Sequence, residues 1–208
     1  MRLPHTSMRL FTALELNTKV IANLTELVRR LRPVAPIRWV HPQNMHVSLK
    51  YIGEWPEARL DTLIRSLSEV RVTQPMTVPL AGLGYFPSAQ RPRVFWAGAE
   101  NTPPLRQLAS GVDFQLSQLG IAPEVRPYIP HLTLGQITSD EPLDEFHKLI
   151  EDLPSREFGT ITPDRFTLFE STVTETGPQC RRVAEFPFQQ PAVEPIIATT
   201  RPQLAGGW

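Results

Sequence analysis

The chain has 208 residues, of which 41% are hydrophobic, a composition that suits one globular domain or two small lobes and excludes a disordered chain. Its 21 basic residues balance 21 acidic ones, which excludes a global positive field for gathering long nucleic acid. Cys180 is the only cysteine, so we expect no disulfide, no cysteine-based zinc site and a cytoplasmic location. No apolar run reaches the roughly 18–20 residues of a membrane span, so no membrane partner is expected.

The first half of the chain predicts strands alternating with helices. Residues 1–7 lack an apolar signal-peptide core and are expected to form an extension outside the fold. Asn17 or Thr18 can cap a helix whose apolar residues recur every three or four positions. Pro79 marks an apolar run as an edge strand or a bulge. In chain order we expect a strand at 9–15, a helix at 20–31, strands at 37–40 and 45–53, a helix at 60–70, a strand at 76–83, a segment at 84–88 that leads into a turn, and a strand at 94–98.

The second half has two more helices and ends in a proline-rich tail. Gly120 is expected to end the first of these helices, and Pro127 and Pro130 keep the segment before the next strand extended. We expect a helix at 105–119, a strand through 130–134, a helix at 143–153, strands at 166–171 and 182–188, and a loosely attached tail at 189–208. Because neighbouring strands are often joined by short turns, the order predicts an α+β fold with antiparallel sheets, not a doubly wound parallel sheet.

Two segments share a four-residue pattern of histidine, aliphatic residue, hydroxyl and leucine. Alternate side chains of a strand share one face, so each histidine lies beside a hydroxyl while the aliphatic residues face a core. One such tetrad is usually an ordinary polar strand face. Two tetrads that use two of only five histidines indicate a site shared by a pseudo-twofold pair of lobes. The tetrads are His46-Val47-Ser48-Leu49 and His131-Leu132-Thr133-Leu134.

Histidines that face each other across a cleft can act as an acid–base pair. A neutral imidazole takes a proton from water and a protonated one gives a proton to a leaving alkoxide, tasks suited to a pKa of about 6.5. The hydroxyls of Ser48 and Thr133 can donate hydrogen bonds to an oxyanion. Such a site fits phosphodiester cleavage without a metal. A zinc site made from His46 and His131 is a weaker alternative, because neither tetrad carries a carboxylate or thiol at ligand spacing.

These tetrads are similar to those of the 2H phosphoesterase superfamily, and the chain most resembles its RNA 2′,3′-cyclic phosphodiesterase family, also called 2′-5′ RNA ligases. The resemblance covers roughly residues 8–188, which we expect to form one domain. It implies a bilobal α+β fold in which two pseudo-symmetric lobes of antiparallel sheet, with flanking helices, surround a central groove. Further similar segments, in family order, are Met8–Leu14, Arg38–Val40, Asn44–His46, Gly82–Pro87, Arg91–Gly98 and Arg126–His131.

The resemblance also implies a reaction. It implies hydrolysis of RNA 2′,3′-cyclic phosphate ends to 2′-phosphomonoesters, with reverse 2′-5′ ligation as a second activity. From the residues we expect a monomer that needs neither a metal nor a cofactor. By the family pattern, His46 is the proton donor to the 3′ leaving oxygen and His131 is the proton acceptor that activates water. Ser48 and Thr133 would bind the phosphate. The expected partners are therefore RNA ends or nucleotides.

Two positions depart from the family pattern. Ser48 stands where threonine is commoner, which keeps the hydroxyl. Gln136 stands where many members have arginine, and it can offer only neutral hydrogen bonds. Arg93 or Arg126 could supply the missing charge, although surface placement explains both arginines equally well.

Two aromatic residues and two other functions stay open. Phe11 and Tyr128 could stack on a base, a contact that tolerates any sequence, but core packing is the favoured role for Phe11. The same chemistry could act on small cyclic nucleotides instead of RNA ends. A non-catalytic module that binds RNA ends is the third interpretation, and the intact tetrads count against it.

Overall fold

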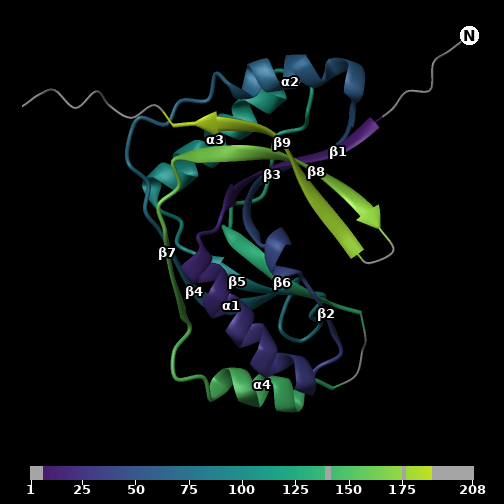
Figure 1. Cartoon of the computed structure of the whole chain (residues 1–208), viewed down its shortest axis with the longest axis vertical. Helices are drawn as coiled ribbons and strands as arrows, with labels where there is room; N and C mark the ends of the chain where they lie inside the picture. Colours follow the sequence, from purple (N-terminus) through teal and green to yellow (C-terminus); the bar gives the residue numbers. More distant parts are fainter. Residues whose placement is uncertain (1–6, 139–141, 175–176, 189–208) are drawn as a thin grey trace, which may run out of the picture.

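The computed structural model describes residues 7–138, 142–174 and 177–188, which form two antiparallel sheets with helices on their outer faces (Figure 1). The expected extension before Ser7 and the tail from Gln189 lie outside the described residues. Ser7 itself opens the first strand, because it pairs with Pro56 and its hydroxyl donates to Glu54, 2.7 Å away. Among the described helices, none is both long and apolar enough to cross a membrane.

The upper sheet of Figure 1 has four strands in the order β3-β1-β8-β9. Helices α2 (Leu60–Leu67) and α3 (Pro103–Ser117) lie on this side of the molecule, and α3 packs against β3. The apolar residues that we used to predict these helices, including Leu63, Leu67 and Leu108, are buried. The strands are β1 (Ser7–Glu15), β3 (His46–Pro56), β8 (Arg165–Thr174) and β9 (Gly177–Pro187).

The lower sheet has five strands in the order β2-β6-β5-β4-β7. Helix α1 (Thr18–Leu31) packs against β7, and helix α4 (Asp144–Glu151) places Phe146 against Phe95 with ring centroids 5.0 Å apart. Asn17 caps α1 as expected, because its side chain accepts a hydrogen bond from the Val20 backbone at 2.9 Å. The strands are β2 (Ile37–Trp39), β4 (Val78–Phe86), β5 (Val94–Ala99), β6 (His131–Ile137) and β7 (Glu157–Ile161).

The expected bilobal α+β architecture is confirmed, but the lobes are not the two halves of the sequence. The upper sheet takes β1 and β3 from the first half and β8 and β9 from the second, whereas the lower sheet includes β2. One hydrophobic core cluster contains residues of both sheets, such as Leu10 and Val47 with Phe95 and Leu132. The chain therefore crosses between the lobes several times, which fixes the two sheets against each other.

Two parts of the strand prediction were wrong. Strand β7 was not predicted, because only two of its five residues, Phe158 and Ile161, have buried apolar side chains. It forms as an edge strand through its pairing with β4. β4 continues to Phe86, beyond the expected end at residue 83, because Gly84 leaves space for the ring of Trp96 from the neighbouring strand. A Cβ atom at Gly84 would collide with that ring.

Candidate active site

The two tetrads begin the strands β3 and β6, which belong to different sheets and contact each other. The alternation predicted from the sequence is present in both. Each histidine is half-buried, Thr133 is half-buried and Ser48 is exposed. The aliphatic residues of the tetrads, Val47, Leu49, Leu132 and Leu134, are buried in the core. Both His-hydroxyl pairs therefore project from strands whose alternate side chains are fixed in the core.

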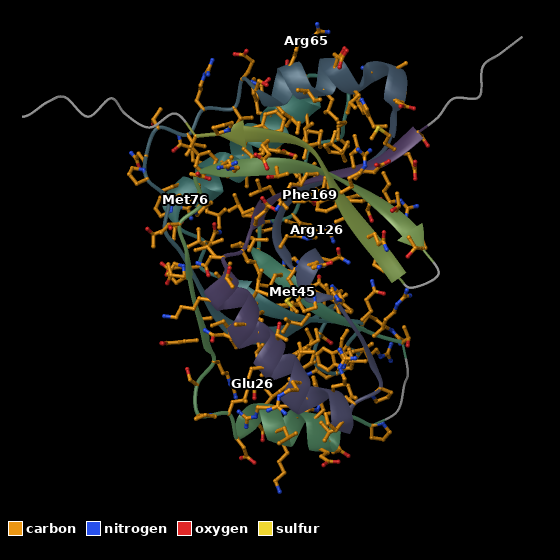
Figure 2. All side chains as sticks on the ribbon, in the orientation of Figure 1. Glu26, Met45, Arg65, Met76, Arg126 and Phe169 are labelled. Atoms are coloured by element: carbon orange, nitrogen blue, oxygen red, sulfur yellow. The ribbon has the colours of Figure 1, made fainter. Side chains whose placement is uncertain are left out.

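His46 lies on an aromatic base. Its ring stacks on Phe11 with centroids 4.7 Å apart, and Phe169 lies 6.0 Å from it in a nearly parallel plane. Figure 2 shows Phe169 and Met45, the buried residue before His46, near the middle of the molecule. Phe11 is only 7% exposed, which agrees with the packing role favoured by the sequence and leaves little surface for stacking on a base.

His131 packs against two aromatic residues of the lower sheet. Its ring meets Phe86 edge-on at 4.9 Å and Trp96 at 5.9 Å. Sequence analysis gave these two residues no role, although both fall in segments that carry the family resemblance. Their positions follow from strand register, because β5 pairs with both β4 and β6 and brings Trp96 opposite Gly84 and Thr133.

Each imidazole is held by the backbone two residues before it. His131 Nδ1 lies 2.8 Å from the Ile129 carbonyl oxygen, and His46 hydrogen-bonds with the backbone of Asn44. A carbonyl oxygen can only accept, so His131 Nδ1 carries the hydrogen and its Nε2 is left to exchange protons with a ligand. The same local arrangement in both tetrads fixes both rings without occupying a second side chain.

The electrostatics of the two histidines differ. The pKa of His46 is lowered from its ordinary value of 6.5 to about 4. Burial is the main cause, the hydrogen bond with the Asn44 backbone opposes it, and the charge of nearby His131 adds to the lowering. His46 is therefore neutral at pH 7 without a ligand. An anion beside it would favour the charged form and raise its pKa.

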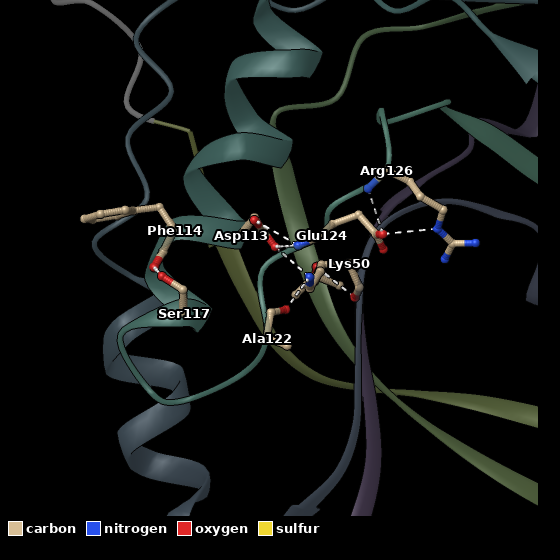
Figure 3. A network of polar contacts seen from close by, with 8 residues as sticks. Lys50, Asp113, Phe114, Ser117, Ala122, Glu124 and Arg126 are labelled. Carbon is tan, nitrogen blue, oxygen red and sulfur yellow. Dashed lines mark hydrogen bonds and ion pairs between the residues drawn. The ribbon is translucent and has the colours of Figure 1, made fainter.

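A polar network ties the loop before His131 to strand β3 (Figure 3). Lys50 Nζ, almost buried, contacts Asp113 on α3 at 2.6 Å and donates to the Ala122 carbonyl at 2.9 Å. Farther along this loop, the Tyr128 hydroxyl donates to the Ser48 carbonyl at 2.9 Å, and burial raises its pKa. Tyr128, a candidate for base stacking, thus links the first tetrad to the loop that precedes the second tetrad.

Arg93 and Arg126 are the two candidates to replace the family arginine, and this role stays a prediction for both. Arg126 is 85% exposed and pairs with Glu124 at 3.3 Å (Figure 3), and Arg93 is an exposed residue whose backbone amide donates to Phe86 at 2.7 Å. Gln136, in contrast, belongs to the histidine face. The register of β6 shifts between Thr133 and Gly135, so Gln136 returns to the face of Thr133. Its exposure, next to buried Gly135 and Ile137, agrees with this.

The part of the chain that the structure describes contains no group of three histidine, cysteine or carboxylate side chains placed to hold a metal ion. The zinc alternative would therefore need ligands from beyond the described residues. The four tetrad side chains instead suit proton transfer and hydrogen bonding to an anion.

Comparison with known proteins identifies the family of the chain. The model of the "LigT like Phosphoesterase" family matches residues 14–96 and 98–179. A Thermotoga maritima protein named RNA 2′,3′-cyclic phosphodiesterase is 33% identical over 88% of this chain and 96% of its own length. A Thermus thermophilus protein of the same name is 34% identical over 82% of this chain and 85% of its own.

Solved structures show the same fold. A crystal structure of a Thermus thermophilus protein superposes with a TM-score of 0.74 at 29% identity, covering 87% of this chain and 98% of the other. The Escherichia coli LigT structure with 3′-AMP, at 24% identity, also gives a TM-score of 0.74 over 89% of this chain and all of that one. With the family model matched over most of its length, the chain belongs to the LigT-like phosphoesterase family.

Proposed function

We propose that this protein hydrolyses 2′,3′-cyclic phosphates at RNA ends to 2′-phosphomonoesters. The observation that carries the proposal is that two His-hydroxyl pairs lie on contacting strands, one from each sheet. His46 and His131 are close enough for the charge of His131 to lower the pKa of His46. The activity named for the relatives from Thermotoga maritima and Thermus thermophilus supports the same reaction.

In the proposed mechanism, His131 accepts a proton from a water molecule that attacks phosphorus, and His46 gives a proton to the 3′ oxygen as its bond to phosphorus breaks. The hydroxyls of Ser48 and Thr133 donate hydrogen bonds to the phosphoryl oxygens. His46 must be protonated for this role, although its pKa in the free protein is about 4. The anionic cyclic phosphate supplies the compensating charge, so substrate binding and protonation of His46 are coupled.

The same site would join two RNA ends if a 5′-hydroxyl took the place of water. His131 would then accept the proton of that hydroxyl, and the product would be a 2′-5′ phosphodiester. Both reactions, hydrolysis and ligation, proceed by opening the cyclic ester, so neither reaction needs ATP. Action on small cyclic nucleotides is the second candidate, because the exposed Ser48 and half-buried Thr133 contact only a phosphate in this mechanism. A monomeric, cytoplasmic protein stays a prediction.

Hydrolysis should persist in EDTA, because the acid, the base and the phosphate-binding groups are all side chains of this protein. The measurement uses an oligonucleotide with a 2′,3′-cyclic phosphate end and, in parallel, a mononucleotide 2′,3′-cyclic phosphate, each with and without chelator. Unchanged rates are expected for whichever substrate is used. Loss of activity on chelation, restored by adding back one metal, would contradict the proposed acid–base mechanism.

A further inference from the structure

An arginine that sequence analysis left without a role lies on the histidine face of the lower sheet. Arg38 is in the short strand β2 and pairs directly with Gln136 of β6. Directly opposed residues of an antiparallel pair project from the same face, with Cβ atoms roughly 5 Å apart. Since Gln136 shares the face of Thr133, Arg38 shares it too. Its neighbours Ile37 and Trp39 point to the other face, where Ile37 is buried and Trp39 meets Phe95.

The guanidinium of Arg38 has no ion pair or side-chain hydrogen bond with any residue that the structure describes, and the side chain is exposed. Other arginines near the tetrads are already engaged. Arg182 contacts Glu15, the strand partner of His46, at 2.6 Å, and Arg126 contacts Glu124. The tetrad hydroxyls carry no charge. Arg38 therefore supplies a permanent positive charge to this face that no carboxylate among the described residues neutralises.

The distance between Arg38 and Thr133 places Arg38 away from the reacting phosphate. Gln136 lies three residues after Thr133, but the register shift in β6 matches these to only two residue steps of β5, from Trp96 to Val94. Two such steps and one step between strands place the Arg38 Cα roughly 8–10 Å from that of Thr133. A phosphate held by Thr133 and the histidines would be at the far limit of the Arg38 side chain. A second phosphate, farther from the histidines along the same face, would lie within its reach. Arginine is also the side chain best suited to bind a phosphate through two parallel hydrogen bonds.

We propose that Arg38 binds the phosphate on the 5′ side of the terminal nucleoside, so that the enzyme selects RNA ends over nucleosides that carry only the cyclic phosphate. The proposal rests on the proposed function and deepens it, because it names the substrate class. In an RNA chain this second phosphate is the diester that joins the last two nucleotides. In a mononucleotide it can be supplied as a 5′-phosphate, which isolates its effect from that of the extra base.

The test compares adenosine 2′,3′-cyclic phosphate that has a free 5′-hydroxyl with the same compound bearing a 5′-phosphate. Arg38→Gln should lower kcat/KM for the 5′-phosphorylated substrate by about 10–150-fold, the range for loss of a hydrogen bond to a charged group. The 5′-hydroxyl substrate should change by less than about threefold, within the effect of a surface substitution. Rising salt should reduce the advantage of the 5′-phosphate in the wild type but not in the variant.

Two further variants control for charge and position. Arg65→Gln removes an exposed arginine from α2, at the end of the molecule opposite α4 (Figure 2), and should leave the ratio of the two kcat/KM values unchanged. The double variant Arg38→Gln/Gln136→Arg moves the guanidinium across one strand pair. It should restore most of the preference for the 5′-phosphate, which a purely structural role of Arg38 would not do.

A loss of equal size on both substrates would overturn the proposal, since Arg38 would then act at the reacting phosphate. No loss on either substrate would overturn it as well. Binding measured by calorimetry separates this proposal from the proposed function. Adenosine 2′,5′-bisphosphate should bind more tightly than adenosine 2′-monophosphate, and Arg38→Gln should abolish the difference. That result would support the Arg38 site even if the wild type hydrolysed neither cyclic phosphate, an outcome that would refute the proposed function alone.

Discussion

Replacing His46 or His131 by alanine should lower kcat/KM for a cyclic-phosphate-ended RNA by about 10²–10⁴-fold, the usual contribution of a positioned acid or base. The two histidines act on one displacement, so the double variant should be little slower than the slower single variant. His41→Ala is the matched control, because His41 is an exposed histidine on the loop before the same strand. Rates for these variants and the wild type are measured with one RNA under identical conditions.

Variants of the two tetrad hydroxyls, measured in the same experiment, provide rate losses with which the histidine variants can be compared. Ser48→Ala and Thr133→Ala each remove one hydrogen bond to a charged phosphate, for which about 10–150-fold is expected. They should therefore cost less than either histidine. Hydroxyl variants as inactive as the histidine variants would mean that the roles are assigned wrongly. Additive losses for the two histidines would mean that they do not act in one step.

Acid should destabilise the folded protein through His46. The unfolded chain protonates this histidine near pH 6.5, whereas the folded protein keeps it neutral down to about pH 4. The unfolded state therefore binds more protons between these values, and stability falls as the pH is lowered. The difference between the two pKa values corresponds to about 3 kcal/mol of unfolding free energy, all of it lost below about pH 4 and none of it lost above about pH 7.

Denaturant unfolding of the wild type and of His46→Gln from pH 7.5 to 4 measures this contribution. The glutamine stays neutral, so the stability difference between the two proteins should shift by about 3 kcal/mol in favour of the variant as the pH falls. Parallel curves would show that His46 is not held neutral by burial. Inorganic phosphate should raise the pKa of His46 in an NMR titration of the wild type, because an anion stabilises the imidazolium.

Local sequence patterns predicted the parts of the site that depend on one strand at a time. The alternation of His46, Val47, Ser48 and Leu49 is enough to place the first and third side chains toward the site and the others in the core. The helix cap at Asn17 and the antiparallel sheets were predicted for the same reason, since caps and short connections are encoded by neighbouring residues.

Contacts between strands that are far apart in the sequence could not be predicted from local sequence patterns. The shift of register in β6 places Gln136 on the face of Thr133, and only the pairing of β2 with β6 brings Arg38 beside it. Alternation alone would have placed Gln136 on the core face, and no local signal marks Arg38 as its partner. Trp96 and Phe86 reach His131 through the same sheet pairing. The charge and aromatic surroundings of a site built from two sheets are therefore set by register.

Identification of the phosphate ester formed from a cyclic-phosphate-ended RNA tests the central claim most directly. With His46 donating its proton to the 3′ oxygen, the account predicts that the wild type produces only the 2′-phosphomonoester, in EDTA as well as without it, and that His46→Ala and His131→Ala leave the cyclic phosphate intact over the same time. A 3′-phosphate product, or wild-type protein that leaves the cyclic end unopened while binding the RNA, would contradict it.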